Sequence, residues 1–218
     1  MSINMAIATT LEDRLIELGG IAAMRVRLDP APGHATLADL MAVNESKEHG
    51  LFELVDGTLV EKAMSYEASI VAIAIARIIG TFVFKNRLGL TSGADGFFRL
   101  QTSTRGPDVA FVAREKLPGG TFPSQVYPQI VPNLVVEVLS PGNTKAEMAR
   151  KRLEYFHCGV QVVWMVDCTH RTVAIYTSPS EWCVVKEHEM IDGGDAIPGF
   201  TSCVGDFFAD LDIGQPTV

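Results

Sequence analysis

The chain has 218 residues, and its hydrophobic fraction of 47% and charged fraction of 20% are typical of a globular protein. This length suits one domain, with room for an additional subdomain. The net charge of -8 argues mildly against non-specific binding to a polyanion, because phosphate contacts need clustered Lys and Arg side chains.

The cysteines and the start of the chain indicate a reducing compartment. Cys158, Cys168, Cys183 and Cys203 are widely spaced and contain no C-x-x-C pair, so their spacing does not favour a zinc site. The first ten residues lack the basic start and long apolar run of a secretory signal. We therefore expect reduced thiols in a cytoplasmic protein.

Two short helices and a hairpin are expected in the first third of the chain. Residues 11–18 predict a helix closed by two glycines, and residues 36–41 predict another that begins with a threonine cap. The pair Asp56-Gly57 separates two β-rich runs. Because this pair supplies the positive φ angles of a tight turn, it predicts a β-hairpin.

The longest apolar stretch runs from Ala68 to Phe84 and contains Arg77. At about 17 residues with an internal charge it is short for a membrane span, so we expect a buried helix and no membrane segment. Ser65 precedes the stretch as a candidate cap, and Glu67 lies in the first turn, where the helix dipole favours an acid.

The rest of the chain predicts a mixed sheet with helices packed on it, an α/β architecture of the α+β type. No G-x-G-x-x-G or P-loop pattern occurs, which excludes the common nucleotide-binding folds. The predicted elements are a bent strand over 90–100, a strand over 107–112, a loop over 116–132, a strand over 133–139, a helix over 144–158, strands over 160–167, 172–176 and 182–187, and a short helix over 205–211.

Two of the predicted core strands carry a lone acid. Asp108 begins one apolar strand, and Glu137 lies near the end of another. A buried carboxylate is costly unless a metal, a proton or a basic group compensates it, and the Glu137 strand itself contains no basic residue. If the strands are neighbours, the two acids could hold Mg²⁺ together with water and phosphate oxygens. The alternative for Asp108 is that it caps a backbone group after Pro107.

Lys151 is the candidate cation for such a site, because it lies on the helix that follows the Glu137 strand. Spacing places Glu147, Lys151 and Tyr155 on one helix face, and a lysine there could stabilise developing negative charge. The simpler interpretation is an exposed i,i+4 ion pair between Glu147 and Lys151. Glu53 is a further candidate acid, although it could face water on the hairpin.

Short segments from about residue 36 to residue 210 occur in an order and spacing that resemble one family. The segments are Glu53-Leu54-Val55-Asp56-Gly57, Gly93-Ala94-Asp95-Gly96, Pro107-Asp108-Val109-Ala110-Phe111-Val112, Glu137-Val138-Leu139-Ser140-Pro141, Lys151 with Tyr155, Gly159-Val160 and Trp164-Met165-Val166-Asp167. In these segments the chain resembles the Uma-two family of restriction-endonuclease-like proteins, in the PD-(D/E)xK nuclease superfamily.

The resemblance implies metal-dependent hydrolysis of DNA phosphodiester bonds with Mg²⁺ or Mn²⁺. It maps the motif acids onto Asp108 and Glu137. The usual lysine of the superfamily would fall at Leu139, and Lys151 takes its place from the following helix. The helix acid of the superfamily would be Glu67, with Glu53 as the other choice. Candidate contacts to the DNA backbone are Arg99, Arg105, Lys145 and Arg150.

The predicted organisation is an N-terminal extension over 1–35, a restriction-endonuclease-like domain over 36–212 and a tail over 213–218. The function expected is that of an endonuclease. Leucine at position 139 and the acidic charge balance leave a non-catalytic binding or scaffold protein as the alternative, and a hydrolase for another phosphate ester as a third. By analogy with nucleases that act in pairs, a homodimer is expected if the strands over 160–166 and 172–176 lie near a sheet edge.

Overall fold

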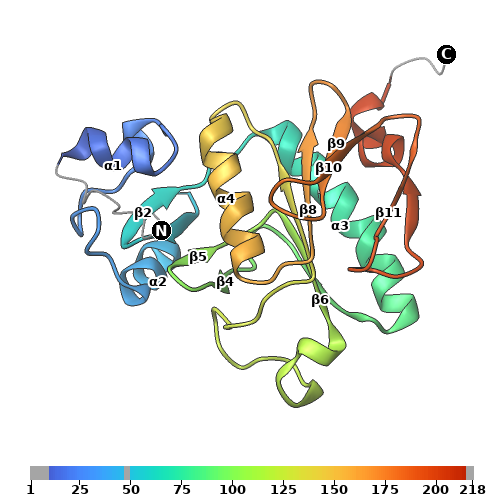
Figure 1. Ribbon diagram of the computed structural model, residues 1–218, viewed down its shortest axis with the longest axis horizontal. Helices are drawn as coiled ribbons and strands as arrows, with labels where there is room; N and C mark the ends of the chain where they lie inside the picture. Colours follow the sequence, from blue (N-terminus) through green and yellow to red (C-terminus); the bar gives the residue numbers. More distant parts are fainter. Residues whose placement is uncertain (1–9, 47–49, 215–218) are drawn as a thin grey trace.

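The computed structural model describes residues 10–46 and 50–214, and a six-stranded mixed sheet forms the centre of this part of the chain (Figure 1). The strand order is β10-β9-β8-β7-β6-β3. Only the β7–β8 pair is parallel, and the other four pairs are antiparallel. The strands are β3 (Gly89–Ser92), β6 (Val109–Ala113), β7 (Leu134–Val138), β8 (Val162–Asp167), β9 (Thr172–Tyr176) and β10 (Trp182–Lys186).

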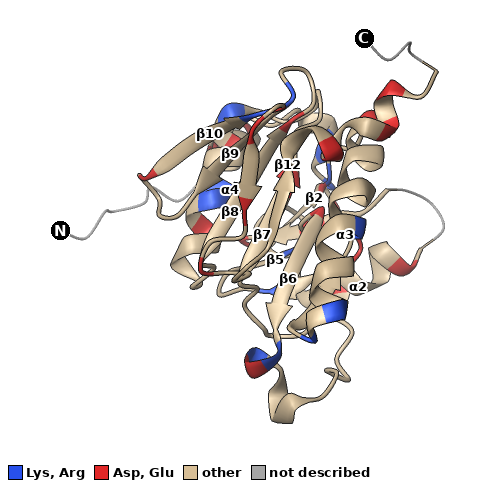
Figure 2. Cartoon of the chain, turned by 90° about the vertical axis from the view of Figure 1, so that its right-hand side faces the viewer, with Lys and Arg blue, Asp and Glu red and all other residues tan. Residues whose placement is uncertain are grey.

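Helices α3 (Tyr66–Asn86) and α4 (Lys145–His157) cover opposite faces of this sheet, as Figure 2 shows. Strand side chains alternate between the two faces. Val136 and Val138 of β7 belong to the core beneath α3, whereas Val135 belongs to the core beneath α4. By the same alternation, Glu137 points toward α4.

Helix α3 is long and apolar enough to cross a membrane when judged by length and composition alone. In the structure it packs along the sheet, and Val71, Ile75 and Ile79 in its middle are fully buried. Ser65 caps its first turn by accepting a hydrogen bond from the Ala68 backbone N–H, as the sequence predicts. The expected core helix is therefore present.

A second, four-stranded sheet of order β2-β1-β5-β4 lies beside the first. The predicted hairpin turn has φ angles of 44° at Asp56 and 70° at Gly57. The N-terminal segment adds to this sheet, because Val26 bridges to Val60. Its elements are α1 (Leu11–Glu17), α2 (Leu37–Glu45), β1 (Phe52–Val55), β2 (Thr58–Glu61), β4 (Phe98–Arg99) and β5 (Ser103–Arg105).

Several predicted elements differ in detail from the structure. The bent strand over 90–100 is two strands, because β3 joins the large sheet and β4 joins the small one. The short helix over 205–211 is a pair of 3-10 turns, Val204–Phe207 and Ala209–Asp212. The sequence did not predict the two-stranded sheet of β11 (Met190–Asp192) and β12 (Thr201–Cys203). Two further 3-10 turns, Arg114–Lys116 and Pro118–Gly120, follow β6, and another, Ala23–Arg25, follows α1.

The two strands of the dimer argument lie near one edge of the large sheet, since β9 is next to the edge strand β10 and β8 is one strand further in. Strands β8 and β9, which correspond to the runs over 160–166 and 172–176, each have neighbours on both sides, and the edges of the sheet are β10 and β3. A homodimer stays a prediction. Of the predicted segments, residues 1–9 of the extension and residues 215–218 of the tail lie outside the described residues.

Candidate active site

Antiparallel pairing of β6 and β7 brings the two predicted acids together. Val109 pairs with Val136, so Asp108 just before β6 lies opposite Glu137 on β7. The negative charge of Asp108 is one of the causes that raise the pKa of Glu137, after the burial of that carboxylate. The two strands are thus neighbours, as the prediction of a shared site requires.

Glu137 is fully enclosed, with a relative exposure of 3%. Its Oε1 accepts hydrogen bonds from the Tyr155 hydroxyl at 2.5 Å and from Lys151 Nζ at 3.2 Å, and its Oε2 lies 3.1 Å from the same Nζ. The basic partner that its own strand lacks therefore comes from α4. This pairing offsets part of the desolvation cost of a buried carboxylate.

Lys151 bridges two buried acids, because its Nζ also lies 3.1 Å from Glu53 Oε1. Both Glu53 and Lys151 are enclosed, with relative exposures of 2% and 4%. The hypothesis of an exposed ion pair between Glu147 and Lys151 is therefore wrong. The small sheet and the N-terminal segment cover this face of α4, which spacing within the helix could not reveal.

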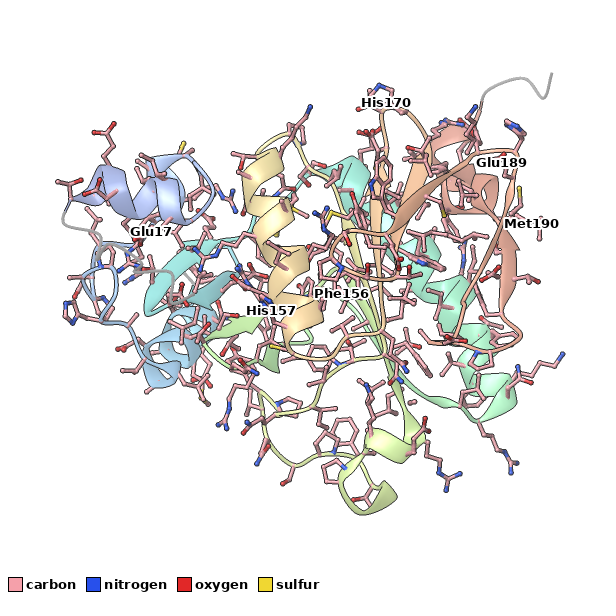
Figure 3. The ribbon with its side chains drawn as sticks, viewed as in Figure 1. Glu17, Phe156, His157, His170, Glu189 and Met190 are labelled. Atoms are coloured by element: carbon pink, nitrogen blue, oxygen red, sulfur yellow. The ribbon has the colours of Figure 1, made fainter. Side chains whose placement is uncertain are left out.

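Glu147 has a structural partner of its own. Its carboxylate accepts two hydrogen bonds from the Arg25 guanidinium, at 2.7 and 3.0 Å, and it completes the capping box of α4 with Thr144. Figure 3 shows the side chains around α4, where Phe156 and His157 mark the last turn of the helix. Glu147 lies in the first turn, at the other end, and fixes the start of the helix.

Asp108 is the most accessible acid of the cluster, with 19% of its side chain exposed. Its Oδ2 accepts a hydrogen bond from the Val138 backbone N–H at 2.8 Å, and its Oδ1 lies 3.2 Å from Lys62 Nζ. The structural interpretation of Asp108, that it binds a backbone group, is therefore confirmed. Oδ1, which faces Lys62, makes no backbone hydrogen bond among the described residues.

Sequence reasoning missed Lys62, which is buried just after β2. Its Nζ donates to the Gly106 carbonyl oxygen at 2.5 Å and to the Ala94 carbonyl oxygen at 3.2 Å, besides pairing with Asp108. A lysine at the end of a hairpin strand normally suggests a solvated side chain. Both faces of β2 are buried, so alternation along the strand gave no signal.

The surrounding charges set the protonation states of the cluster. Burial opposes ionisation of Glu53, but Lys151 and Arg105 outweigh it and lower the pKa of Glu53 to about 2. Burial and the neighbouring acids Asp108 and Glu53 raise the pKa of Glu137, although Lys151 acts against them. Burial likewise acts against the charge of Lys151, but Glu137 and Glu53 raise its pKa overall.

Three of the arginines predicted to contact DNA already have partners within the protein. Arg105 is buried between Glu53 at 2.8 Å and Glu154 at 2.7 Å, so it cannot reach a DNA backbone, and that prediction is wrong. Arg150 pairs with Asp56 and Glu154, and Arg99 donates to Gln129. Both are half-buried.

An open cleft of about 670 Å³ lies beside the cluster, between α4, β8 and the start of α3. Exposed Lys145 and Glu67 lie on its lining, as do Leu139 and Ser140 at the end of β7. Glu67 therefore lies at the cleft, whereas Glu53 belongs to the cluster through its ion pairs with Arg105 and Lys151. A smaller cavity of about 180 Å³ is lined by Asp108, Lys62 and Ser140. Ser140 borders both spaces, and Asp108 and Lys62 are the cluster residues that line the smaller one.

The donor set fits a metal held by few side chains. Within residues 10–46 and 50–214, no group of three or more His, Cys, Asp or Glu side chains could hold an ion. Mg²⁺ commonly binds through one or two carboxylates and completes its shell with water and substrate oxygens. Asp108 is partly exposed and lies opposite Glu137 across the β6–β7 pair, so two carboxylates are available at one strand end.

Comparison with known proteins agrees with this geometry. The model of the Uma2 family, described as "putative restriction endonuclease", matches residues 37–209. None of the curated proteins compared with the chain matches it. The crystal structure of a putative nuclease belonging to DUF820, from Anabaena variabilis ATCC 29413, has a TM-score of 0.68 at 18% identity and covers 78% of this chain and 96% of that chain. The predicted family and the restriction-endonuclease-like fold are confirmed.

Proposed function

Because the chain belongs to the Uma2 family, we propose that it is a metal-dependent endonuclease that hydrolyses phosphodiester bonds in DNA. The observation that carries the proposal is the convergence of Asp108, Glu137 and Lys151 at one end of the β6–β7 pair, next to an open cleft. Paired carboxylates with a lysine at a strand end are suited to phosphoryl chemistry.

Each residue of the cluster has a distinct role in the proposal. Asp108 and Glu137 would hold Mg²⁺ or Mn²⁺. A bound divalent ion lowers the pKa of a water and neutralises charge on a phosphoryl oxygen. Lys151 supplies positive charge from α4 in place of the lysine that would stand at Leu139, and Glu53 and Tyr155 position its ammonium group and the Glu137 carboxylate.

Lys145 is the remaining candidate for a DNA contact at the cleft. It is exposed in the first turn of α4 and lines the cleft, so its ammonium group can meet a phosphate without breaking an internal ion pair. Arg99 and Arg150 would first have to leave Gln129 and Asp56. We therefore place the substrate backbone along the side of the cleft that is formed by α4.

One observation favours the alternative, a nuclease fold kept as a binding or scaffold protein. Every carboxylate of the cluster already has a cationic partner, since Glu53 contacts Arg105 and Lys151, Asp108 contacts Lys62, and Glu137 contacts Lys151. Such a network is satisfied without a metal. This alternative predicts that no divalent ion binds in a way that depends on Glu137.

The direct test is nicking of supercoiled plasmid DNA in the presence of Mg²⁺. We expect Asp108→Asn to lower the nicking rate at least about 100-fold, because it removes a charge from the proposed metal site. The matched control is Asp195→Asn, at an exposed aspartate far along the chain, which should keep the rate of the wild type. Equal trace activity in the wild-type protein and the Asp108→Asn variant would contradict the proposal.

A further inference from the structure

A basic groove lies at the end of the large sheet opposite to the candidate active site. Asp108 precedes β6, whereas Arg114 follows it, and a strand of this length spans about 17 Å. The groove has a volume of about 530 Å³, and Lys85, Arg87 and Arg114 lie on its lining. Figure 2 shows Lys and Arg segments, in blue, near the end of α3 and just beyond β6.

The cations of the groove are not used by the fold. All three side chains are exposed, and none of them makes an ion pair or a side-chain hydrogen bond with another described residue. No acidic residue belongs to the described lining of the groove. The dipole of α3 accounts for cations near its C-terminus, which suffices for Lys85 and Arg87 but not for Arg114, since it lies after a strand. In a chain with a net charge of -8, this local excess of positive charge favours an anionic ligand.

Exposed aromatic rings border the same groove. Phe84 is 85% exposed and Phe122 is 80% exposed, although burial of phenylalanine is normally favourable. Arg87 ends α3 in the left-handed conformation, with φ at 54°, a position at which glycine is the usual residue. The backbone conformation therefore does not explain why this position carries an arginine. Cations interleaved with exposed aromatic rings are the combination that binds single-stranded nucleic acid.

An apolar cavity of about 220 Å³ continues from the groove, between β3 and the loop that follows β6. Leu90, Leu117 and Phe122 line both spaces. Phe98 also lines the cavity, and so does Ser92, whose Oγ is buried without a hydrogen-bond partner among the described residues. A buried hydroxyl of this kind is costly unless a ligand or water satisfies it.

We propose that this face binds an unpaired nucleotide of the DNA, with its base in the apolar cavity and its phosphates on Lys85, Arg87 and Arg114. The cavity is smaller than the 300–1,000 Å³ or so of sites for drug-sized ligands, and it suits one flat heterocycle with a polar edge for Ser92. This inference rests on the proposed function and adds that the substrate contains unpaired bases several nucleotides away from the scissile bond.

The charge component is tested by fluorescence anisotropy with a labelled 16-nucleotide thymidine strand, in EDTA so that cleavage plays no part. We expect the triple variant Lys85→Glu, Arg87→Glu, Arg114→Glu to bind this strand at least about ten-fold more weakly. The slope of log K against log salt concentration should become shallower by about 2, because each lost phosphate contact removes about 0.7 from it. The matched control is Lys186→Glu, at an exposed lysine on the opposite edge of the sheet. If the triple variant binds like this control, the inference fails.

The base component needs a second ligand, a 16-nucleotide strand made only of abasic sites. We expect Phe122→Ala to weaken binding of the thymidine strand about ten-fold and to leave binding of the abasic strand unchanged, because only the former has a ring to stack. Equal losses for both strands, or tighter binding of fully paired duplex than of the thymidine strand, would overturn the inference. The plasmid-nicking results for the wild type and the Asp108→Asn variant test the proposed function alone. The binding assays do not require cleavage, so they test the inference separately.

Discussion

Lys151 is the side chain that links the buried charges, because its ammonium group lies 3.1 Å from a carboxylate oxygen of Glu53 and 3.1 Å from one of Glu137. Removing it would leave two enclosed acids without their shared cation. Breaking a buried ion pair in this way costs about 3–5 kcal/mol, whereas an exposed i,i+4 pair contributes only about 0.5 kcal/mol.

We therefore expect Lys151→Met to lower the free energy of unfolding by about 3–5 kcal/mol, measured by urea denaturation at pH 7. The matched control is Lys145→Met on the same helix, where the lysine is exposed and the change should stay within about 0.5 kcal/mol. A loss smaller than about 1 kcal/mol for Lys151→Met would show that the cluster does not need this charge.

Helix α4 delivers Lys151 and Tyr155 to the cluster, and the N-terminal segment fixes where it begins. Thr144 caps the helix by accepting a hydrogen bond from the Glu147 backbone N–H at 3.0 Å, and its hydroxyl donates to the Gly19 carbonyl oxygen at 2.5 Å. Gly19 packs directly on this turn, since a Cβ there would lie 2.4 Å from the Glu147 backbone nitrogen. The extension thus positions the site although it lies far from it in sequence.

This contact predicts unequal effects of two neighbouring substitutions. Gly19 and Gly20 both have positive φ angles, 96° and 68°, so alanine is strained at either position, but a Cβ on Gly20 would meet nothing within 4 Å. We expect Gly19→Ala to lower the thermal stability by about 1–3 kcal/mol more than Gly20→Ala, because only the former pushes against α4. Equal losses in calorimetric unfolding would mean that the extension does not set the position of the helix.

Across the molecule, the sequence is most informative where the signal is local. The Asp56-Gly57 turn, the Thr36 and Ser65 caps and the lone acids on apolar strands each depend on a few adjacent residues, and all are found in the structure. The pairs that join the N-terminal segment and the small sheet to the rest of the chain could not be predicted. Arg25 and Glu147 are 122 positions apart, and the contact of Lys62 with Asp108 depends on how the two sheets are joined.

The same limit explains the incorrect assignments. Arg105 was expected at the surface, and so was Lys151 in the simpler interpretation of an ion pair with Glu147, because charged side chains are rarely enclosed unless they are paired. Only the assembled sheets show that their partners, Glu53, Glu137 and Glu154, surround them.

Isothermal titration calorimetry with Mn²⁺ tests whether Asp108 and Glu137 form a metal site in the folded protein. We expect the wild type and Asp195→Asn to bind one ion per chain, and Asp108→Asn and Glu137→Gln each to bind at least about ten-fold more weakly, because each removes a carboxylate ligand. No binding by the wild type, or equal binding by all four proteins, would contradict the metal-dependent site and leave the scaffold alternative.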